Sequence, residues 1–297
     1  MDTWTIQKLL NWLTKRFTDK GLDSPRLSAE LLLGSVLEKK RLELYTQFDK
    51  VVAKERLDRL HDLVKRAEQG EPIAYLTGRT EFYSMELDIT PDCLIPRPET
   101  ELLVERAIEF LRGRSGKQLV CDLCTGCGCV AAAIAKNFRD ARVIATDISD
   151  VALKTAARNI DKHKLNDRVT LLCGDLFDPI VPELGGGGPV LSAVEGFDLI
   201  VCNPPYVSAA EFEKLDKTVK DFEPRSALFG GDNGLEVYRR ICEKADAFLK
   251  PDAALMMEIG YSQGQAVREL LTQTGCFSEI TIEKDFNNND RVAIAKK

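Results

Sequence analysis

The sequence predicts an α/β protein in which a small bundle of helices precedes a mostly parallel sheet covered by helices on both faces. Residues 1–71 repeat apolar positions at helical spacing, and prolines punctuate residues 72–98. Across residues 99–297, short apolar strands alternate with amphipathic helices. We therefore expect a helical domain, a linker and a larger α/β domain, which suits a chain of 297 residues.

The composition is typical of a globular protein in water, with 44% hydrophobic and 30% charged residues. No apolar run has the length that spans a bilayer, and the chain does not start as a signal peptide does. We therefore expect a cytoplasmic protein with no membrane partner. The net charge of −6 argues against a dedicated binder of bare duplex DNA. The nine cysteines are an odd number, which disfavours a complete disulfide framework.

The helices of the first domain follow from spacing and capping residues. Apolar side chains between Thr3 and Lys20 recur at helical spacing until Gly21, and Ser24-Pro25 is a cap followed by a residue suited to a first helical turn. Helices are expected over residues 3–20, 24–37, 42–47 and 54–69. Residues 81–89 then alternate loosely, as a strand or hairpin does, and nearby prolines mark the linker.

Strand and helix alternate through the second domain, as they do in a parallel sheet. Strands are expected over residues 118–123, 142–146, 169–173, 197–202 and 253–259, and helices over residues 130–138, 151–163, 235–249 and 262–272. Residues 280–284 and 291–295 could pair as a closing antiparallel hairpin. The stretch Gly185–Gly196 contains consecutive glycines with no helix start or lysine behind them. We interpret it as a mobile surface insertion rather than a phosphate-binding loop.

A glycine-containing turn follows the first strand of this domain. Asp122 lies at the end of the strand, and Thr125–Gly128 leads into a helix, where glycine permits a tight turn and close approach of a ligand. Asp147 ends the second strand, where nucleotide-binding folds place the acceptor for ribose hydroxyls. The turn fits the dinucleotide pattern G-x-G-x-x-A, and also the methyltransferase pattern D-x-G-x-G-x-G with Cys124 replacing the first glycine. The glycines alone do not decide between these cofactors.

Cysteines crowd the same turn, at positions 121, 124, 127 and 129. This spacing superficially suggests a zinc or iron–sulfur site. Cys121 and Asp122 must point to opposite faces of a strand, however, and Cys129 belongs to the following helix, so four thiolates would not converge easily. We therefore expect no metal and interpret the cysteines as small, mildly apolar packing residues.

The most informative stretch is Asp198–Tyr206, an apolar strand that runs into Asn203-Pro204-Pro205-Tyr206. Two prolines cannot continue a ladder and make a rigid corner. The Asn203 side-chain oxygen and the Pro204 carbonyl can accept hydrogen bonds from a planar NH₂ group, while Tyr206 can stack on it. A purely structural alternative is that the prolines end a strand and Tyr206 packs. The position of the stretch downstream of the Asp122 turn favours methyl transfer to a planar nitrogen.

Together with further segments, these motifs resemble the HemK/PrmC-type protein-(glutamine) methyltransferases that modify peptide chain release factors. The further segments are Ile95–Glu101, Gly174–Phe177, Phe222–Leu228, Gly230–Leu235 and Leu255–Gly260. The resemblance covers nearly the whole chain and implies a Rossmann-like class I methyltransferase domain at residues 99–297. It also implies a hairpin linker at residues 72–98 and a helical substrate-recognition domain at residues 1–71. The implied reaction carries a methyl group from S-adenosylmethionine to the Gly-Gly-Gln glutamine of bacterial class-one release factors.

The resemblance further implies roles for individual residues. S-adenosylmethionine would be bound by Cys124, Thr125, Gly126, Cys127, Gly128, Asp147, Asp175, Leu176 and Asn203. The glutamine amide would be bound by Asn203, Pro204, Pro205 and Tyr206, of which Asn203, Pro204 and Tyr206 would be catalytic. Family members often carry an aromatic residue at the position of Leu176, so contact there would be apolar. Arg97 and Glu99 would help to order the cofactor site, or Glu99 would cap the next helix.

Other functions remain open from the sequence. The sister branch of the family methylates a glutamine of a ribosomal protein, although residues 222–228 and 230–235 favour the release-factor branch. Amino methylation of nucleic acid would need a basic groove and room for a flipped base. The acidic balance disfavours that reaction, and we expect no direct DNA substrate. A non-catalytic scaffold or cluster-binding protein is the remaining alternative.

Overall fold

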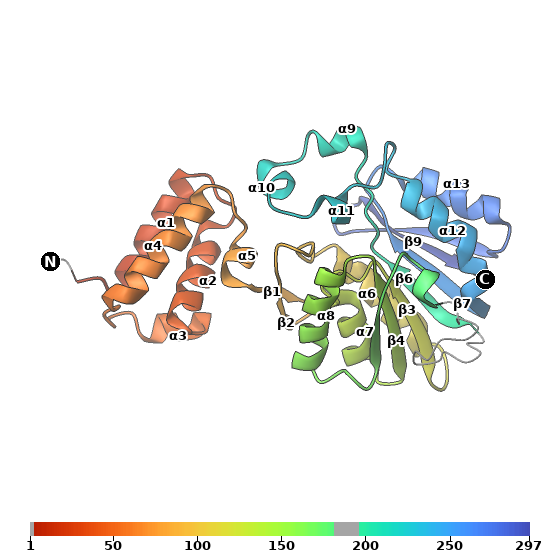
Figure 1. The fold of residues 1–297 in the computed structure, drawn as a ribbon, viewed down its shortest axis with the longest axis horizontal. Coiled ribbons are helices and arrows are strands. Elements are labelled where there is room, and N and C mark those ends of the chain that lie inside the picture. Colours follow the sequence, from red (N-terminus) through yellow and green to blue (C-terminus); the bar gives the residue numbers. More distant parts are fainter. Residues whose placement is uncertain (1–2, 181–195) are drawn as a thin grey trace. The chain divides into compact units, whose positions relative to one another are not determined.

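Residues 3–180 and 196–297 are described by a computed structural model, drawn in Figure 1. The chain divides into two units, Met1–Arg79 with Asp216–Phe222, and Thr80–Leu215 with Glu223–Lys297. The insertion predicted at Gly185–Gly196 lies, apart from Gly196, outside the described residues. Among the helices that are described, none is both long enough and apolar enough to cross a membrane.

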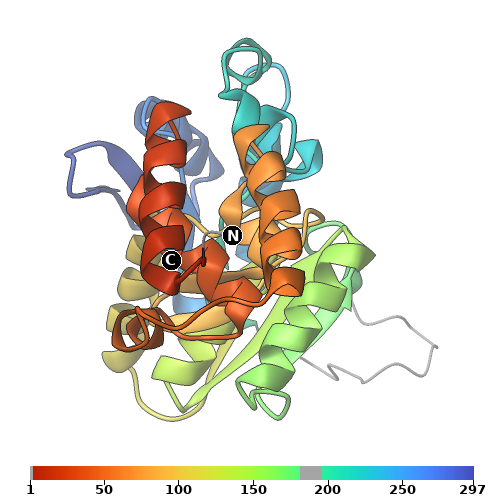
Figure 2. The same ribbon diagram turned by 90° about the vertical axis from the view of Figure 1, so that its left-hand side faces the viewer.

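Five helices of the first unit share one apolar core, and Figure 2 draws them in red and orange. They are α1 (Ile6–Asp19), α2 (Pro25–Leu37), α3 (Arg41–Thr46), α4 (Lys54–Glu68) and α5 (Ile73–Thr77), whereas the short α10 (Lys217–Lys220) belongs to the same unit but contains no buried residue. Leu10, Leu13 and Phe17 of α1 are fully buried, as their spacing predicted. The four predicted helices are confirmed. We missed α5 and α10 because five or fewer residues cannot display a helical period.

The second unit contains a seven-stranded sheet in the order β5-β4-β3-β6-β7-β9-β8. The strands are β3 (Gln118–Leu123), β4 (Ala141–Asp147), β5 (Val169–Cys173), β6 (Phe197–Cys202), β7 (Leu249–Glu258), β8 (Glu279–Lys284) and β9 (Asp290–Lys296). The first five strands in this order are parallel, whereas β9 is antiparallel to both of its neighbours. The predicted parallel sheet and closing hairpin are confirmed. Strand β7 begins at Leu249, earlier than predicted. A register shift between the Leu249 and Ala254 pairs leaves Pro251 without a partner on β6, so the strand can continue through the proline.

Helices cover both faces of this sheet. One apolar cluster contains α6 (Thr100–Arg112), α7 (Cys129–Asn137) and α8 (Asp150–Lys162), and the other contains α12 (Glu236–Phe248) and α13 (Gly264–Thr274). The central strand β3 serves both clusters, because Val120 points into the first and Cys121 into the second. The expected hairpin also forms, from β1 (Arg79–Phe82) and β2 (Met85–Asp88). The short helices α9 (Ala209–Phe212) and α11 (Arg225–Leu228) and the turn of 3₁₀-helix η1 (Asp178–Ile180) were not predicted.

The sheet topology brings the predicted motifs to one edge. Leu123 at the end of β3 lies between Thr146 of β4 and Cys202 of β6 in the strand register. The chain runs from β3 through β4 to β5 on one side and returns on the other side at β6, so the strand order reverses beside β3. Open α/β sheets bind ligands at such a reversal, outside the carboxyl ends of the strands.

Candidate active site

The turn after β3 has a left-handed backbone at Cys124, Gly126 and Gly128, with φ of 57°, 56° and 79°. Asp122 stabilises this turn through two hydrogen bonds. Its carboxylate accepts from the Thr125 hydroxyl at 2.6 Å and from the Ala131 N–H at 3.1 Å. Burial raises the pKa of Asp122 to about 7. Asp122 therefore orders the turn and the start of α7 from inside the protein.

Cys124 occupies a conformation that glycine adopts far more easily. A left-handed backbone costs an L-residue roughly 1–2 kcal/mol, because its Cβ approaches the following carbonyl oxygen. The Cys124 side chain is half-buried and packs on the apolar cluster that contains Cys202. Burial raises the pKa of the Cys202 thiol, and the neighbouring Cys124 thiol raises it further. Cys124 thus holds a backbone conformation that favours glycine, at the cost of local strain.

The crowded cysteines lie on different sides of the turn. Cys121 is fully buried in the strand, whereas Cys127 and Cys129 neighbour each other at the start of α7. Across residues 3–180 and 196–297, no group of three or more His, Cys, Asp or Glu side chains is arranged to hold a metal ion. Burial raises the pKa of the Cys121 thiol, as expected for a packing residue.

Asp147 is placed as an acceptor beside the turn. One oxygen accepts from the Gly126 N–H at 2.8 Å and the other from the Ser149 N–H at 2.9 Å, and burial raises its pKa. A carboxylate has about four acceptor positions, so capacity for ribose hydroxyls remains. A Cβ placed on Gly126 would meet no atom within 4 Å, so space is open beside the turn. Ile148, which we did not single out, is 67% exposed next to Asp147 and offers an apolar surface to a nucleoside.

The residues after β5 lie at the same edge. The N–H of Gly174 donates to the Asp147 carbonyl oxygen at 2.9 Å, which links β5 to β4. Asp175 forms an ion pair with Arg240 at 2.5 Å, and Leu176 is buried with only 6% exposed. The assignment of Asp175 and Leu176 to the adenine stays a prediction.

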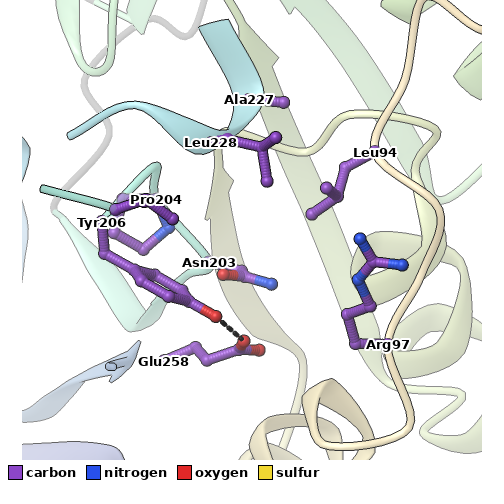
Figure 3. Close-up of a pocket in the computed structure, with 9 residues that line it drawn as sticks. Leu94, Arg97, Asn203, Pro204, Tyr206, Ala227, Leu228 and Glu258 are labelled. Carbon is purple, nitrogen blue, oxygen red and sulfur yellow. Dashed lines mark hydrogen bonds between the residues drawn. The ribbon is translucent and has the colours of Figure 1, made fainter. Parts of the chain in front are cut away.

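Asn203 stands at one end of a hydrogen-bonded chain that reaches Tyr206 through Thr100 and Glu258. Its Nδ2 donates to the Thr100 hydroxyl at 3.1 Å, and that hydroxyl donates to Oε2 of Glu258 at 2.6 Å. The Tyr206 hydroxyl donates to the other oxygen of Glu258 at 3.3 Å, and Figure 3 shows this contact. Glu258 is 1% exposed, and burial raises its pKa to about 7. Thr100 and Glu258 lie in two of the segments that carry the family resemblance, but no role was predicted for either residue.

A small cavity opens beside these groups. It is lined by Leu94, Arg97, Asn203, Pro204, Tyr206, Val207, Ala227, Leu228 and Glu258. Arg97 forms an ion pair with the buried Glu223 at 2.5 Å, and Glu223 also accepts from the Ile95 N–H at 3.3 Å. Glu99 occupies the cap position of α6, where its charge lies at the start of the helix, although its side chain makes no capping hydrogen bond. In Figure 3, Arg97 and Leu94 face Tyr206 and Pro204 across Asn203.

Two glycines and one glutamine pack against the backbone of the corner formed by Pro204, Pro205 and Tyr206. A Cβ on Gly230 would lie 2.5 Å from the Pro205 carbonyl oxygen, and one on Gly234 would lie 2.3 Å from the Tyr206 carbonyl oxygen. Gln263 donates through Nε2 to the same Tyr206 oxygen at 3.0 Å. The segment Gly230–Leu235 therefore contains glycine because the backbone of the corner passes too close for any side chain.

Substituting Gly234 with alanine tests this support. The variant would place a methyl group against the Tyr206 carbonyl oxygen at φ of 72°, so the corner must shift and turnover should fall about tenfold or more. Gly275→Ala is the matched control, because Gly275 has φ of 68° but nothing within 4 Å of its Cβ. Turnover and thermal unfolding are measured for both variants. Both suffer the backbone strain of a positive φ, but only Gly234→Ala should also displace the corner. Equal turnover in the two variants would contradict the supporting role of Gly234.

Comparison with known proteins places these motifs in context. Residues 8–78 match the family model described as the PrmC N-terminal domain, and residues 99–222 match the Methyltransferase small domain. A release factor glutamine methyltransferase of Rhodopirellula baltica is 40% identical over 297 residues, which cover 99% of this chain and 97% of that protein. One of Geobacter sulfurreducens is 38% identical over 291 residues, which cover 98% and 96% of the two chains.

Among solved structures, the catalytic domain of hMettl16 in complex with the MAT2A 3′UTR hairpin 6 is similar to this chain. The two share a TM-score of 0.54 at 16% identity, and the match covers 84% of each chain. At that identity the likeness shows a shared fold.

Proposed function

Because the chain belongs to the family of release factor glutamine methyltransferases, we propose that it methylates the side-chain amide nitrogen of the glutamine in the Gly-Gly-Gln motif of bacterial class-one peptide chain release factors. The methyl donor is S-adenosylmethionine. Release factors act on the ribosome, so the enzyme would meet its substrate in the cytoplasm. The expectation that DNA is not a substrate remains part of this proposal.

One observation carries the proposal: two unused acceptors stand at the strand edge that also holds the Asp147 turn. Among the described residues, neither Oδ1 of Asn203 nor the carbonyl oxygen of Pro204 accepts a hydrogen bond. Asn203 follows β6, which pairs with β3, while Asp147 ends β4 on the opposite side of β3. A planar NH₂ group has two N–H donors, which these two oxygens can accept together.

The residues present fit S-adenosylmethionine. Gly126 leaves open space, Asp147 retains acceptor capacity, and Ile148 offers an apolar surface. When bound there, the cofactor supplies an electrophilic methyl group on a sulfonium. We assign the contacts of the nucleoside to the turn Cys124–Gly128 and to Asp147, with Asp175 and Leu176 at the adenine.

The protein's contribution to the reaction is alignment and charge stabilisation. The lone pair of an amide nitrogen is delocalised into the carbonyl, so the nitrogen is a weak nucleophile. Acceptance of hydrogen bonds from its two N–H groups by Oδ1 of Asn203 and the carbonyl oxygen of Pro204 would orient the nitrogen and stabilise the positive charge that develops on it. Tyr206 would cover the flat group and exclude water. The proton can leave as the methyl arrives or afterwards, so a strong base is not required beforehand.

A direct comparison of substrates tests the choice of release factor. The purified enzyme is incubated separately with a release factor, with the ribosomal protein that the sister branch modifies, and with unmodified DNA, each with labelled cofactor. We expect label on the release factor alone. Label confined to the ribosomal protein or to DNA would overturn the proposal.

We further propose that the helical unit recognises the body of the release factor. Removal of residues 1–71 should then lower the turnover of an intact release factor at least about tenfold, since each lost 1.4 kcal/mol of binding is a factor of ten. Turnover of a short Gly-Gly-Gln peptide should change little, because the peptide lacks that body. Calorimetric cofactor affinity equal to that of the full chain shows that the site is intact. Equal losses on both substrates would contradict the recognition role.

A further inference from the structure

We propose that Thr100 and Glu258 are positioning residues that decide which end of the Asn203 carboxamide faces the substrate. The inference rests on the proposed function, in which Oδ1 of Asn203 accepts a hydrogen bond from the substrate NH₂ group. Thr100 begins α6, Asn203 follows β6 and Glu258 ends β7, so three separate elements meet in one hydrogen-bonded chain. Neither positioning residue needs to touch the substrate.

The direction of the chain follows from what each group can donate. An ionised carboxylate only accepts, so the Thr100 hydroxyl must give its single proton to Glu258. The Thr100 oxygen is then left as an acceptor, which the Asn203 Nδ2 uses at 3.1 Å. The hydrogen-bond network thereby fixes the orientation of the amide. Oδ1 must point away from Thr100, and it is left to accept from the NH₂ group of a substrate.

Thr100 and Glu258 are both buried, which restricts their movement and raises the question of why a carboxyl group lies inside the protein. Thr100 is 2% exposed and Glu258 is 1% exposed, so a carboxyl group has been withdrawn from water. Its oxygens bind only the hydroxyls of Thr100 and Tyr206 among the described residues. Such withdrawal costs stability unless the group is well paired. A role in orienting both Asn203 and Tyr206, the two side chains at the corner, accounts for its presence.

The same chain predicts a pH dependence. Above about pH 7 the Glu258 carboxyl is mainly ionised and accepts, whereas below it the carboxyl is mainly protonated and can donate to Thr100. Thr100 would then donate to Oδ1 and turn the Asn203 amide round, so kcat should fall as the pH drops through 7. Among the described residues, the charged and titratable groups around Glu258 include Arg291, Glu99 and the hydroxyls of Tyr206 and Tyr238, and Arg97 lines the same cavity.

Thr100→Val tests the proposal, since valine has the same shape but no hydroxyl. We expect kcat to fall about tenfold to a hundredfold, as for other small misplacements of a reacting group, with cofactor affinity unchanged. The acid limb of the pH profile should also disappear. Thr100→Ser restores the hydroxyl and should restore kcat. Thr155→Val is the control for loss of a buried hydroxyl, because Thr155 is 1% exposed and, in the described part of the chain, its hydroxyl contacts Thr90 and Arg158 rather than the corner; it should keep wild-type kcat.

A double-mutant cycle with Asn203→Ala separates positioning from general structural damage. If Thr100 acts through Asn203, Thr100→Val should slow the Asn203→Ala enzyme no further. An additional loss of the same size in both backgrounds would overturn the inference. Wild-type kcat in Thr100→Val with impaired Asn203→Ala would also overturn it, while the proposed function stands. Wild-type turnover in Asn203→Ala would instead refute the proposed function and the inference that rests on it.

Discussion

Replacement of Asn203 by alanine should lower kcat about a hundredfold to a thousandfold. The side-chain oxygen is one of two acceptors proposed to orient the substrate NH₂ group, and loss of one preorganised polar contact in a transition state has effects of that size. Within the residues that the structure describes, the Asn203 side chain makes one hydrogen bond, to Thr100, so the fold should tolerate the change. Single-turnover kinetics with saturating cofactor report the chemical step directly.

Cofactor binding should be nearly unchanged in the Asn203→Ala enzyme, because the turn after β3 and Asp147 are untouched. Asn166→Ala is a suitable control, since Asn166 is exposed and bonds to Asp161 far along the chain from the corner. An unchanged chemical rate in Asn203→Ala would refute the catalytic role. A rate loss of the same size in Asn166→Ala would point to unfolding rather than chemistry.

Replacement of Asp147 by alanine should weaken cofactor binding about tenfold to a hundredfold. A hydrogen bond to a charged group contributes about 1.5–3 kcal/mol, and Asp147 also holds the Gly126 N–H at 2.8 Å. The turn would therefore lose both its proposed ribose acceptor and one of its own supports. The dissociation constant of S-adenosylmethionine, measured by calorimetry, reports the effect.

At saturating cofactor, kcat of the Asp147→Ala enzyme should approach that of the wild type, because the corner at Asn203 is intact. Asp150→Ala is the matched control: it removes an exposed carboxylate three residues further on, whose partner is Lys154. Wild-type cofactor affinity in Asp147→Ala would refute the ribose assignment.

The sequence predicted the strand–helix order and the main motifs because those signals are local. Asn203-Pro204-Pro205-Tyr206 and the turn before α7 each occupy a few consecutive residues with distinctive backbone demands. The strands were recognisable from apolar runs bounded by turns. The missed elements are helices of five or fewer residues and α6, for which no range was predicted, and the start of β7 was misplaced at Pro251, which cannot donate to the ladder.

The chain of hydrogen bonds behind Asn203 could not be predicted in the same way. Thr100 and Glu258 lie 158 positions apart, and only the fold brings them together. A glutamate in an apolar strand was visible in the sequence, and it is the signal that could have identified Glu258 as a candidate. The replacement of glycine by Cys124 was visible too, whereas its left-handed backbone required coordinates.

Mass spectrometry of a release factor after reaction with S-adenosylmethionine tests the central claim most directly. The account predicts a gain of about 14 daltons, the mass of one methyl group replacing hydrogen, on a single residue. Fragmentation should locate that gain on the side chain of the Gly-Gly-Gln glutamine. A release factor that stays unmodified, or gains the mass at any other residue, would contradict the account.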